Sequence, residues 1–207
     1  MIFYLLEIVM QFKLTASSFS LLAVTLSTYA AEPLIPMSMT GQPQITMDQG
    51  VPVACGTRIV GIESREILEK EAVWVFDGSF MIRREGYGSL KGYLSRPTQK
   101  QAAGGQFWTP VAIRNFWFRA PGEVATKSLN GRVIDSDTVG AKLYASDTVS
   151  TLTVQRAILR GEPIQIGIEL SRGQDSRIFF GEVVLSEAQK KQISSCIADM
   201  SIPSGGK

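Results

Sequence analysis

From Gln44 onward, short runs of alternating apolar and polar residues are separated by turn-forming residues. Such alternation is typical of strands that bury one face. In 164–170 every second residue is isoleucine or leucine, so this run predicts a strand with one buried face. We expect it to pair with 177–185 across the loop 171–176.

Two dipeptides predict hairpin turns. Asp77-Gly78 lies between apolar runs and fits a two-residue type I′ turn, which would pair Val75 with Phe80. Asn130-Gly131 repeats the signal further along the chain. The runs 141–145 and 149–158 continue the series of short alternating segments, and we interpret them as strands.

A helix is predicted over 187–200. Ser186 and Gln189 form a capping box at its start. Ile193, Cys196, Ile197 and Met200 then follow at helical spacing as one apolar stripe. Residues 64–71 have a weaker helical pattern. Many short strands followed by a closing helix indicate a mainly β protein, an antiparallel β-sandwich or open barrel with one C-terminal helix.

The N-terminal segment is typical of a secretory signal peptide. Starting from Met10, it has Lys13, an apolar centre over 19–26 and the small-residue pattern that ends at Ala30. We therefore expect residues 1–30 to be a signal peptide with Met10 as its true start, and residues 1–9 to be an over-long start or an extra leader. The apolar centre is too short to span a bilayer, which predicts a periplasmic or secreted protein without stable membrane insertion after cleavage.

The rest of the chain divides into three parts. Residues 31–46 are rich in Pro, Ser, Thr and Met without periodicity, which predicts a flexible N-terminal arm. Residues 47–202 form a single β-rich domain that the helix 187–200 closes. Residues 203–207 form a disordered tail.

The chain has two cysteines, Cys55 near the first strand of this domain and Cys196 on the helix. Export places both in an oxidising compartment, and the apolar stripe directs Cys196 toward the body of the protein. We predict a disulfide between them. Two buried thiols or an intermolecular bond are the alternatives.

Composition excludes several functions. A net charge of +2 without a long basic run argues against nucleic acid as a partner. The chain contains no histidine, which excludes Ser-His-Asp and Cys-His catalysis and zinc sites that need imidazole. No S-x-x-K motif is present either. We expect a protein that is not an enzyme and that uses no cofactor or metal.

Two weaker chemical possibilities remain. A carboxylate pair could hydrolyse glycosides, with Glu63, Asp77 and Glu182 as candidates. The thioethers of Met37, Met39 and Met47 could bind Cu(I), although three methionines without histidine or a free cysteine make a poor copper site.

The segment 106–121 breaks the alternation, because neither of its faces is polar. It is a central strand buried on both faces, a strand whose register shifts at a bulge near Asn115, or an exposed aromatic–arginine surface. We predict that Phe116 and Phe118 point inward and that Trp117 and Arg119 point outward, on a strand near an edge or bulge. Tryptophan and arginine are enriched at binding hot spots, which makes four residues candidates for a binding site: Trp108, Arg114, Trp117 and Arg119.

The sequence thus predicts an exported, non-catalytic protein that binds another envelope protein. The first hypothesis is a subunit or accessory factor of a secretion, conjugation or pilus-type assembly, attached to its neighbour by the N-terminal arm. An alternative is a periplasmic inhibitor or immunity protein that blocks a hydrolase. A second alternative is a carboxylate-dependent hydrolase or a metal-handling protein.

Overall fold

The computed structural model describes residues 34–63, 73–97, 108–171 and 176–201, which contain eleven strands and two helices. In chain order the elements are β1 (Leu34–Asp48), β2 (Val51–Glu63), β3 (Val75–Arg83), β4 (Tyr87–Pro97), β5 (Trp108–Pro110), β6 (Ile113–Arg119), β7 (Ile134–Asp135), β8 (Lys142–Asp147), α1 (Thr148–Arg160), β9 (Ile164–Leu170), β10 (Arg177–Gly181), β11 (Val183–Val184) and α2 (Glu187–Ser201).

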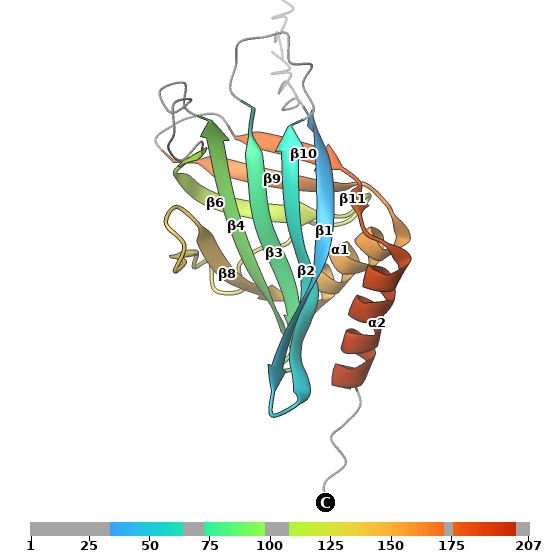
Figure 1. The fold of residues 1–207 in the computed structure, drawn as a ribbon. Coiled ribbons are helices and arrows are strands. Elements are labelled where there is room, and N and C mark those ends of the chain that lie inside the picture. The colour runs from blue at the N-terminus through green and yellow to red at the C-terminus, as the bar shows by residue number, and fades with distance from the viewer. Residues whose placement is uncertain (1–33, 64–72, 98–107, 172–175, 202–207) are drawn as a thin grey trace, which may run out of the picture. The chain divides into compact units, whose positions relative to one another are not determined.

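The strands form one curled sheet in the order β6-β9-β10-β1-β2-β3-β4-β8-β7, with β11 paired to β1 and β5 paired to β4. The sheet is mixed, because β1 runs parallel to β10 and β11 while the other described pairs are antiparallel. It curls into a half-barrel in which β6, β9 and β10 run across β1–β4 (Figure 1). The mainly β, open-barrel prediction with a C-terminal helix is confirmed.

The core lies on the inner face of this curl, together with the buried side of α1. Phe76, Phe80 and Phe116 surround the ring of Phe118, with centroid distances of 5.5 to 5.9 Å. On β9, every second residue from Ile164 to Leu170 is buried. The predicted one-sided strand and its antiparallel pairing with β10 are therefore confirmed.

Helix α1 corrects the interpretation of 149–158 as a strand. Asp147 caps its start by accepting a hydrogen bond from the backbone N–H of Ser150 at 2.7 Å, and Gly161 ends it in the left-handed conformation. The threonines and valines of this run favour strands locally. Val154, Ala157 and Ile158 nevertheless lie on one helical face and are buried, and that burial outweighs the weak local preference.

Contacts on the inner face hold α1 close to the sheet. Gln155 and Thr57 of β2 are both fully buried, and they exchange hydrogen bonds of 3.0 and 3.1 Å. The glycine at position 88 of β4 permits the close approach of Thr151, because a Cβ there would lie 2.1 Å from the Thr151 Oγ1 atom. The helix therefore packs closely against β4 at this glycine, which has no side chain to keep Thr151 away.

The predicted turn at Asp77-Gly78 is wrong, because β3 runs straight through it. Gly78 instead makes room for the neighbouring Phe76 ring, 2.3 Å from where its Cβ would be. A two-residue turn with two positive φ angles occurs at Gln49-Gly50, where φ is 49° and 81°. This turn joins β1 to β2 in a long hairpin. Positive φ angles at both central residues are what a type I′ turn requires.

The predicted flexible arm is also wrong within the described residues, because 34–46 belong to β1. This strand pairs with β2 from Met37 to Asp48 and has β10 and β11 on its other side. Ile35, Met37 and Met39 are buried. The polar and proline residues between them face outward. The segment therefore has the composition of a linker but the alternating burial of a strand.

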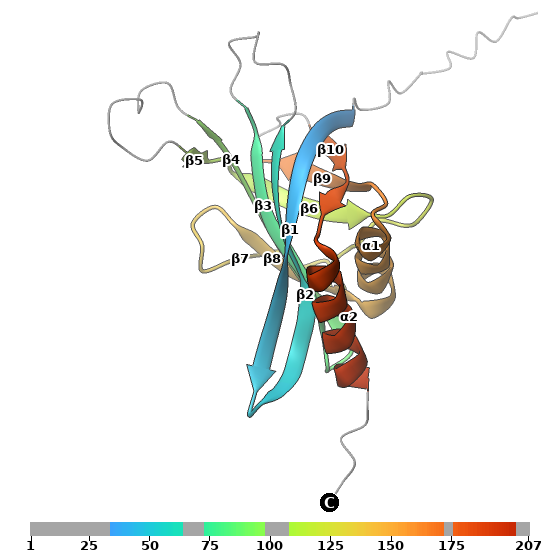
Figure 2. The ribbon, with the colours of Figure 1, turned by 45° about the vertical axis from the view of Figure 1, so that its right-hand side comes forward.

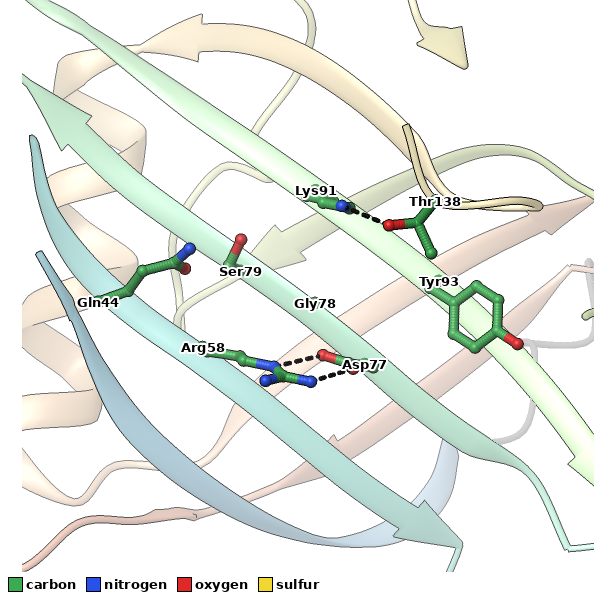
Figure 3. A pocket seen from close by; sticks show the side chains of 8 residues that line it. All are labelled: Gln44, Arg58, Asp77, Gly78, Ser79, Lys91, Tyr93 and Thr138. Carbon is green, nitrogen blue, oxygen red and sulfur yellow. Dashed lines mark hydrogen bonds and ion pairs between the residues drawn. The ribbon is translucent and has the colours of Figure 1, made fainter. Parts of the chain in front are cut away.

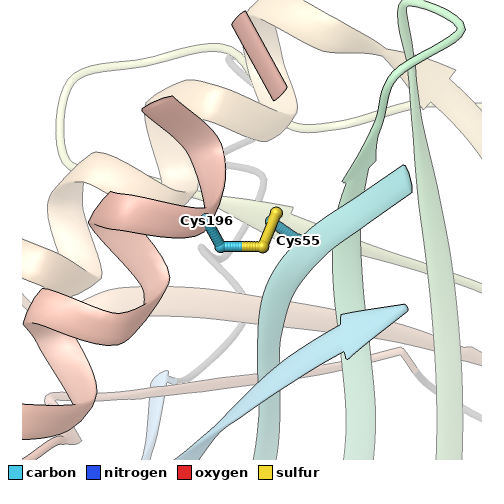
Figure 4. The surroundings of a disulfide bond; sticks show 2 residues. All are labelled: Cys55 and Cys196. Carbon is cyan, nitrogen blue, oxygen red and sulfur yellow. A yellow bond between two sulfur atoms is a disulfide. The ribbon is translucent and has the colours of Figure 1, made fainter. Parts of the chain in front are cut away.

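Helix α2 packs against β1 and β2 alongside their hairpin (Figure 2). The predicted capping box is present: the Ser186 N–H donates to Gln189 Oε1 at 2.8 Å, and the Gln189 N–H donates to Ser186 Oγ at 3.3 Å. The predicted disulfide between Cys55 and Cys196 is confirmed, with a Cα–Cα distance of 5.9 Å (Figure 4). It ties the end of the chain to β2.

Three predictions fall outside the described residues: the signal peptide over 1–30, the short helix over 64–71 and the tail over 203–207. Neither described helix has the length and apolar character needed to cross a membrane.

Candidate functional site

The aromatic stretch predicted as a binding site lies mainly on β6. Among the described strands, β6 pairs only with β9 and so ends the sheet. The register of this pairing shifts between Ile113 and Asn115. Beyond this bulge, Phe116 and Phe118 are buried, while Trp117 and Arg119 are half-buried on the opposite face. The split orientation that the sequence predicts for this strand is the one observed.

On the outer face, Trp117 and Arg119 form one unit with β9. The indole of Trp117 lies over Gly167, where an added Cβ would be 1.9 Å from the ring. The Arg119 guanidinium is 5.2 Å from the Trp117 ring centroid. Arg119 also donates hydrogen bonds from Nε, at 2.9 Å, and from Nη2 to Oε1 of Gln165. Both predicted residues are therefore engaged with the sheet itself.

The other two predicted residues lie on different strands. Arg114 is exposed and forms an ion pair of 2.9 Å with Glu169 of β9. Trp108 belongs to β5, which pairs with the end of β4, and 44% of its surface is exposed. Among the described contacts, none joins Trp108 to Trp117. Arg114, Trp117 and Arg119 thus lie on β6 with partners on β9, whereas Trp108 lies on β5.

A polar hollow of about 490 Å³ lies on the outer face of the sheet over β1–β4 (Figure 3). It is lined by Gln44, Arg58, Asp77, Gly78, Ser79, Lys91, Tyr93 and Thr138. Strand alternation places the polar side chains of neighbouring strands on one face here, since Arg58 pairs opposite Ser79 and Asp77 opposite Tyr93.

Each cation of the polar hollow already has a carboxylate partner. Arg58 donates two hydrogen bonds to Asp77, of 3.0 and 2.6 Å, which raise the pKa of its guanidinium. Lys91 donates to Asp137 at 2.8 Å and to Thr138 at 2.7 Å. Hydrogen bonds from Lys91 and Ser136 hold the pKa of Asp137 far below its usual range. The Lys91–Asp137 pair therefore persists at pH values where an ordinary aspartate is protonated.

The carboxylates considered for hydrolysis do not form a pair. Glu63 is buried on the inner face of β2, and its Oε2 accepts from the Trp74 N–H at 3.2 Å. Asp77 lies on the outer face in its ion pair with Arg58. Glu182 is exposed between β10 and β11. Glu63 and Asp77 lie on opposite faces of the sheet and therefore cannot flank one glycosidic bond.

The three methionines considered for Cu(I) binding do not share one environment. Met37 and Met39 are buried in the core, whereas Met47 is 54% exposed near the tip of the β1–β2 hairpin. Within the part of the chain that the structure describes, no group of three or more His, Cys, Asp or Glu residues could hold a metal ion.

An apolar groove of about 600 Å³ opens where β10 ends and β11 begins, beside β1. Phe180, Val184 and Pro163 contribute to its walls, and Val184 is 67% exposed. Ile62 lies opposite Ser38, which lines the groove, and 49% of its surface is exposed. We call this surface the apolar groove.

Sequence reasoning missed the apolar groove because it treated β1 as an arm. The even-numbered positions of β1 face outward beside β10, with Pro36 opposite Phe180 and Leu34 opposite Ile178. If 34–40 is taken as a strand, the alternation of its side chains predicts that its even-numbered residues face outward.

Comparison with protein-family models, curated proteins and solved structures finds no match to this chain.

Proposed function

We propose that this chain is an exported, non-catalytic binding protein of the cell envelope, acting as a subunit or accessory factor of a secretion, conjugation or pilus-type assembly. The observation that carries the proposal is the apolar groove. Exposed apolar side chains that gather around a hollow are typical of protein–protein contact sites. The groove offers an apolar centre, and Ser38, Thr40 and Glu182 supply polar groups beside it.

The proposed mode of attachment differs from the one expected from the sequence. Because 34–46 belong to β1, this segment is already engaged in the sheet and is not an arm that reaches a neighbour. A preformed sheet surface takes that role. Such a surface binds with little ordering entropy, since its backbone is already paired.

Photo-crosslinking in the cell that makes the protein tests the proposal. Benzoylphenylalanine placed at Ile62 or Val184 should yield a covalent adduct with one envelope protein, which mass spectrometry identifies. The matched control is Val149 of α1, which is 74% exposed and lies away from the groove lining. An adduct of equal yield at Val149, or none at Ile62 and Val184, contradicts the proposal.

A variant that introduces a charge gives an independent readout. Val184→Asp should abolish the adduct formed from position 62, because a carboxylate in the groove opposes burial against an apolar partner. The stability of the free protein should change by less than about 1 kcal/mol, because the side chain is mostly exposed.

A further inference from the structure

A second hollow on the outer face, of about 400 Å³, lies over β3, β4 and β8, away from the apolar groove on β1. Arg83 of β3 and Tyr87 of β4 contribute to one side. Asn130 and Arg132, in the segment that precedes β7, contribute to the other, and Leu143 of β8 also lines it. We call it the basic hollow.

Within the described residues, the charge of the basic hollow is uncompensated. Two of these residues that line it are arginines, and none is an aspartate or glutamate. Among the described residues, no carboxylate forms an ion pair with Arg83 or Arg132. The polar hollow on the same face differs, since its Arg58 and Lys91 both have aspartate partners.

Arg83 carries a second sign of a missing partner. Its Nε atom is buried and has no hydrogen-bond acceptor in the part of the chain that the structure describes. Its guanidinium is 5.8 Å from the centroid of the Tyr87 ring, which also lines the hollow. A buried donor without an acceptor is unfavourable in a folded protein, and an acceptor supplied by a ligand would remove that penalty.

We propose that the basic hollow binds a carboxylate carried on an apolar or aromatic body. The planar guanidinium of arginine matches the two oxygens of a carboxylate. The amide of Asn130 and the hydroxyl of Ser89 add neutral donors, and Leu143 with the Tyr87 ring offers apolar surface for the attached group. The carboxylate can belong to a free small acid or to the end of a polypeptide chain.

This site is separate from the proposed function at the apolar groove, and the two can fail independently. The probes for the test are N-acetyl-Ala-Phe with a free carboxylate, the same dipeptide as its amide, 3-phenylpropionate and inorganic phosphate. Each is titrated into ¹⁵N-labelled, oxidised protein. The readouts are the backbone amides of Asn130 and Ala145 and the Nε–H signal of Arg83.

The carboxylate probes should shift these signals in a saturable way, and the dipeptide amide should bind at least about 10-fold more weakly because it lacks the charge. Arg132→Gln should weaken binding of the acid by about 10-fold or more. The matched control is Arg84→Gln, which removes the same charge from an exposed residue next to Arg83 but outside the hollow. It should change the affinity by less than about 2-fold.

Tighter binding of the dipeptide acid identifies a chain end as the source of the carboxylate, and tighter binding of 3-phenylpropionate identifies a free acid. Equal binding of the acid and the amide overturns the proposal. So does phosphate that binds as tightly as the acids, because the apolar body would then contribute nothing. If Arg132→Gln binds the acid as tightly as Arg84→Gln does, the charge of Arg132 does not contribute to binding and the proposal is overturned.

Discussion

Phe118 and Trp117 are neighbours in the chain, yet they face opposite sides of β6. Phe118 has no exposed surface and contacts three phenylalanine rings. Trp117 is half-buried against Gly167 and Arg119 on the outer face. The sequence predicted this split, because successive side chains of a strand point to opposite faces. Their partners on β3 and β9 could not be predicted, because those residues lie far away in the chain.

The two residues should therefore differ in their effect on stability. Phe118→Ala should lower the free energy of unfolding by about 3–5 kcal/mol, because it leaves a cavity in the core. Trp117→Ala should lower it by about 2 kcal/mol, because much of the indole surface already contacts water. Urea unfolding of the oxidised proteins measures both values. An equal or larger loss for Trp117→Ala would place the indole in the core.

Among the elements, helix α2 could be predicted from its own residues, whereas helix α1 could not. The capping box and the apolar stripe of α2 lie within its own short stretch of sequence, and both were predicted. The helical face of α1 is contained in residues such as Val154 and Ile158, but β-branched residues dominate the run. Its Asp147 cap and its burial against β3 and β4 decide the conformation.

The disulfide determines how firmly α2 is held. Replacing both Cys55 and Cys196 with serine should lower the free energy of unfolding by roughly 2–5 kcal/mol, because the bond closes a long loop and both positions are buried. Urea unfolding of the double variant against the oxidised parent measures the loss.

The parent protein provides the control for this experiment. Under denaturing, non-reducing conditions it should show no labelled thiol, because the two cysteines are joined in a disulfide and the proposed export would keep them in an oxidising compartment. Two labelled thiols per chain would contradict the bond in the protein as the cell makes it.

For the whole molecule, the expected signal-peptide cleavage site lies close to the start of β1 at Leu34. We expect protein purified from the envelope or the medium to begin at Ala31, from the small-residue pattern that ends at Ala30. A cut there leaves all of β1, from Leu34, in the mature protein. Mass spectrometry of the N-terminal peptide measures the start. An intact Met1 or Met10 would remove the basis for export.

The sequence by itself determined features that depend on neighbouring residues: the one-sided burial of β9, the capped helix α2 and the inward and outward sides of β6. The cysteine pair was also predicted, from the expected export and the apolar stripe of α2. Periodicity and capping act over a few residues, so they can be read directly.

Apart from the pairing of β9 with β10, only the tertiary structure decided which strands meet. It placed β1 between β2 and β10, folded 148–160 as a helix and carried β3 through Asp77-Gly78. It also left Arg83 and Arg132 without carboxylate partners among the described residues, while Arg58 and Lys91 received theirs. Each of these outcomes depends on residues far apart in the chain, and pairing over such separations leaves no local pattern to read.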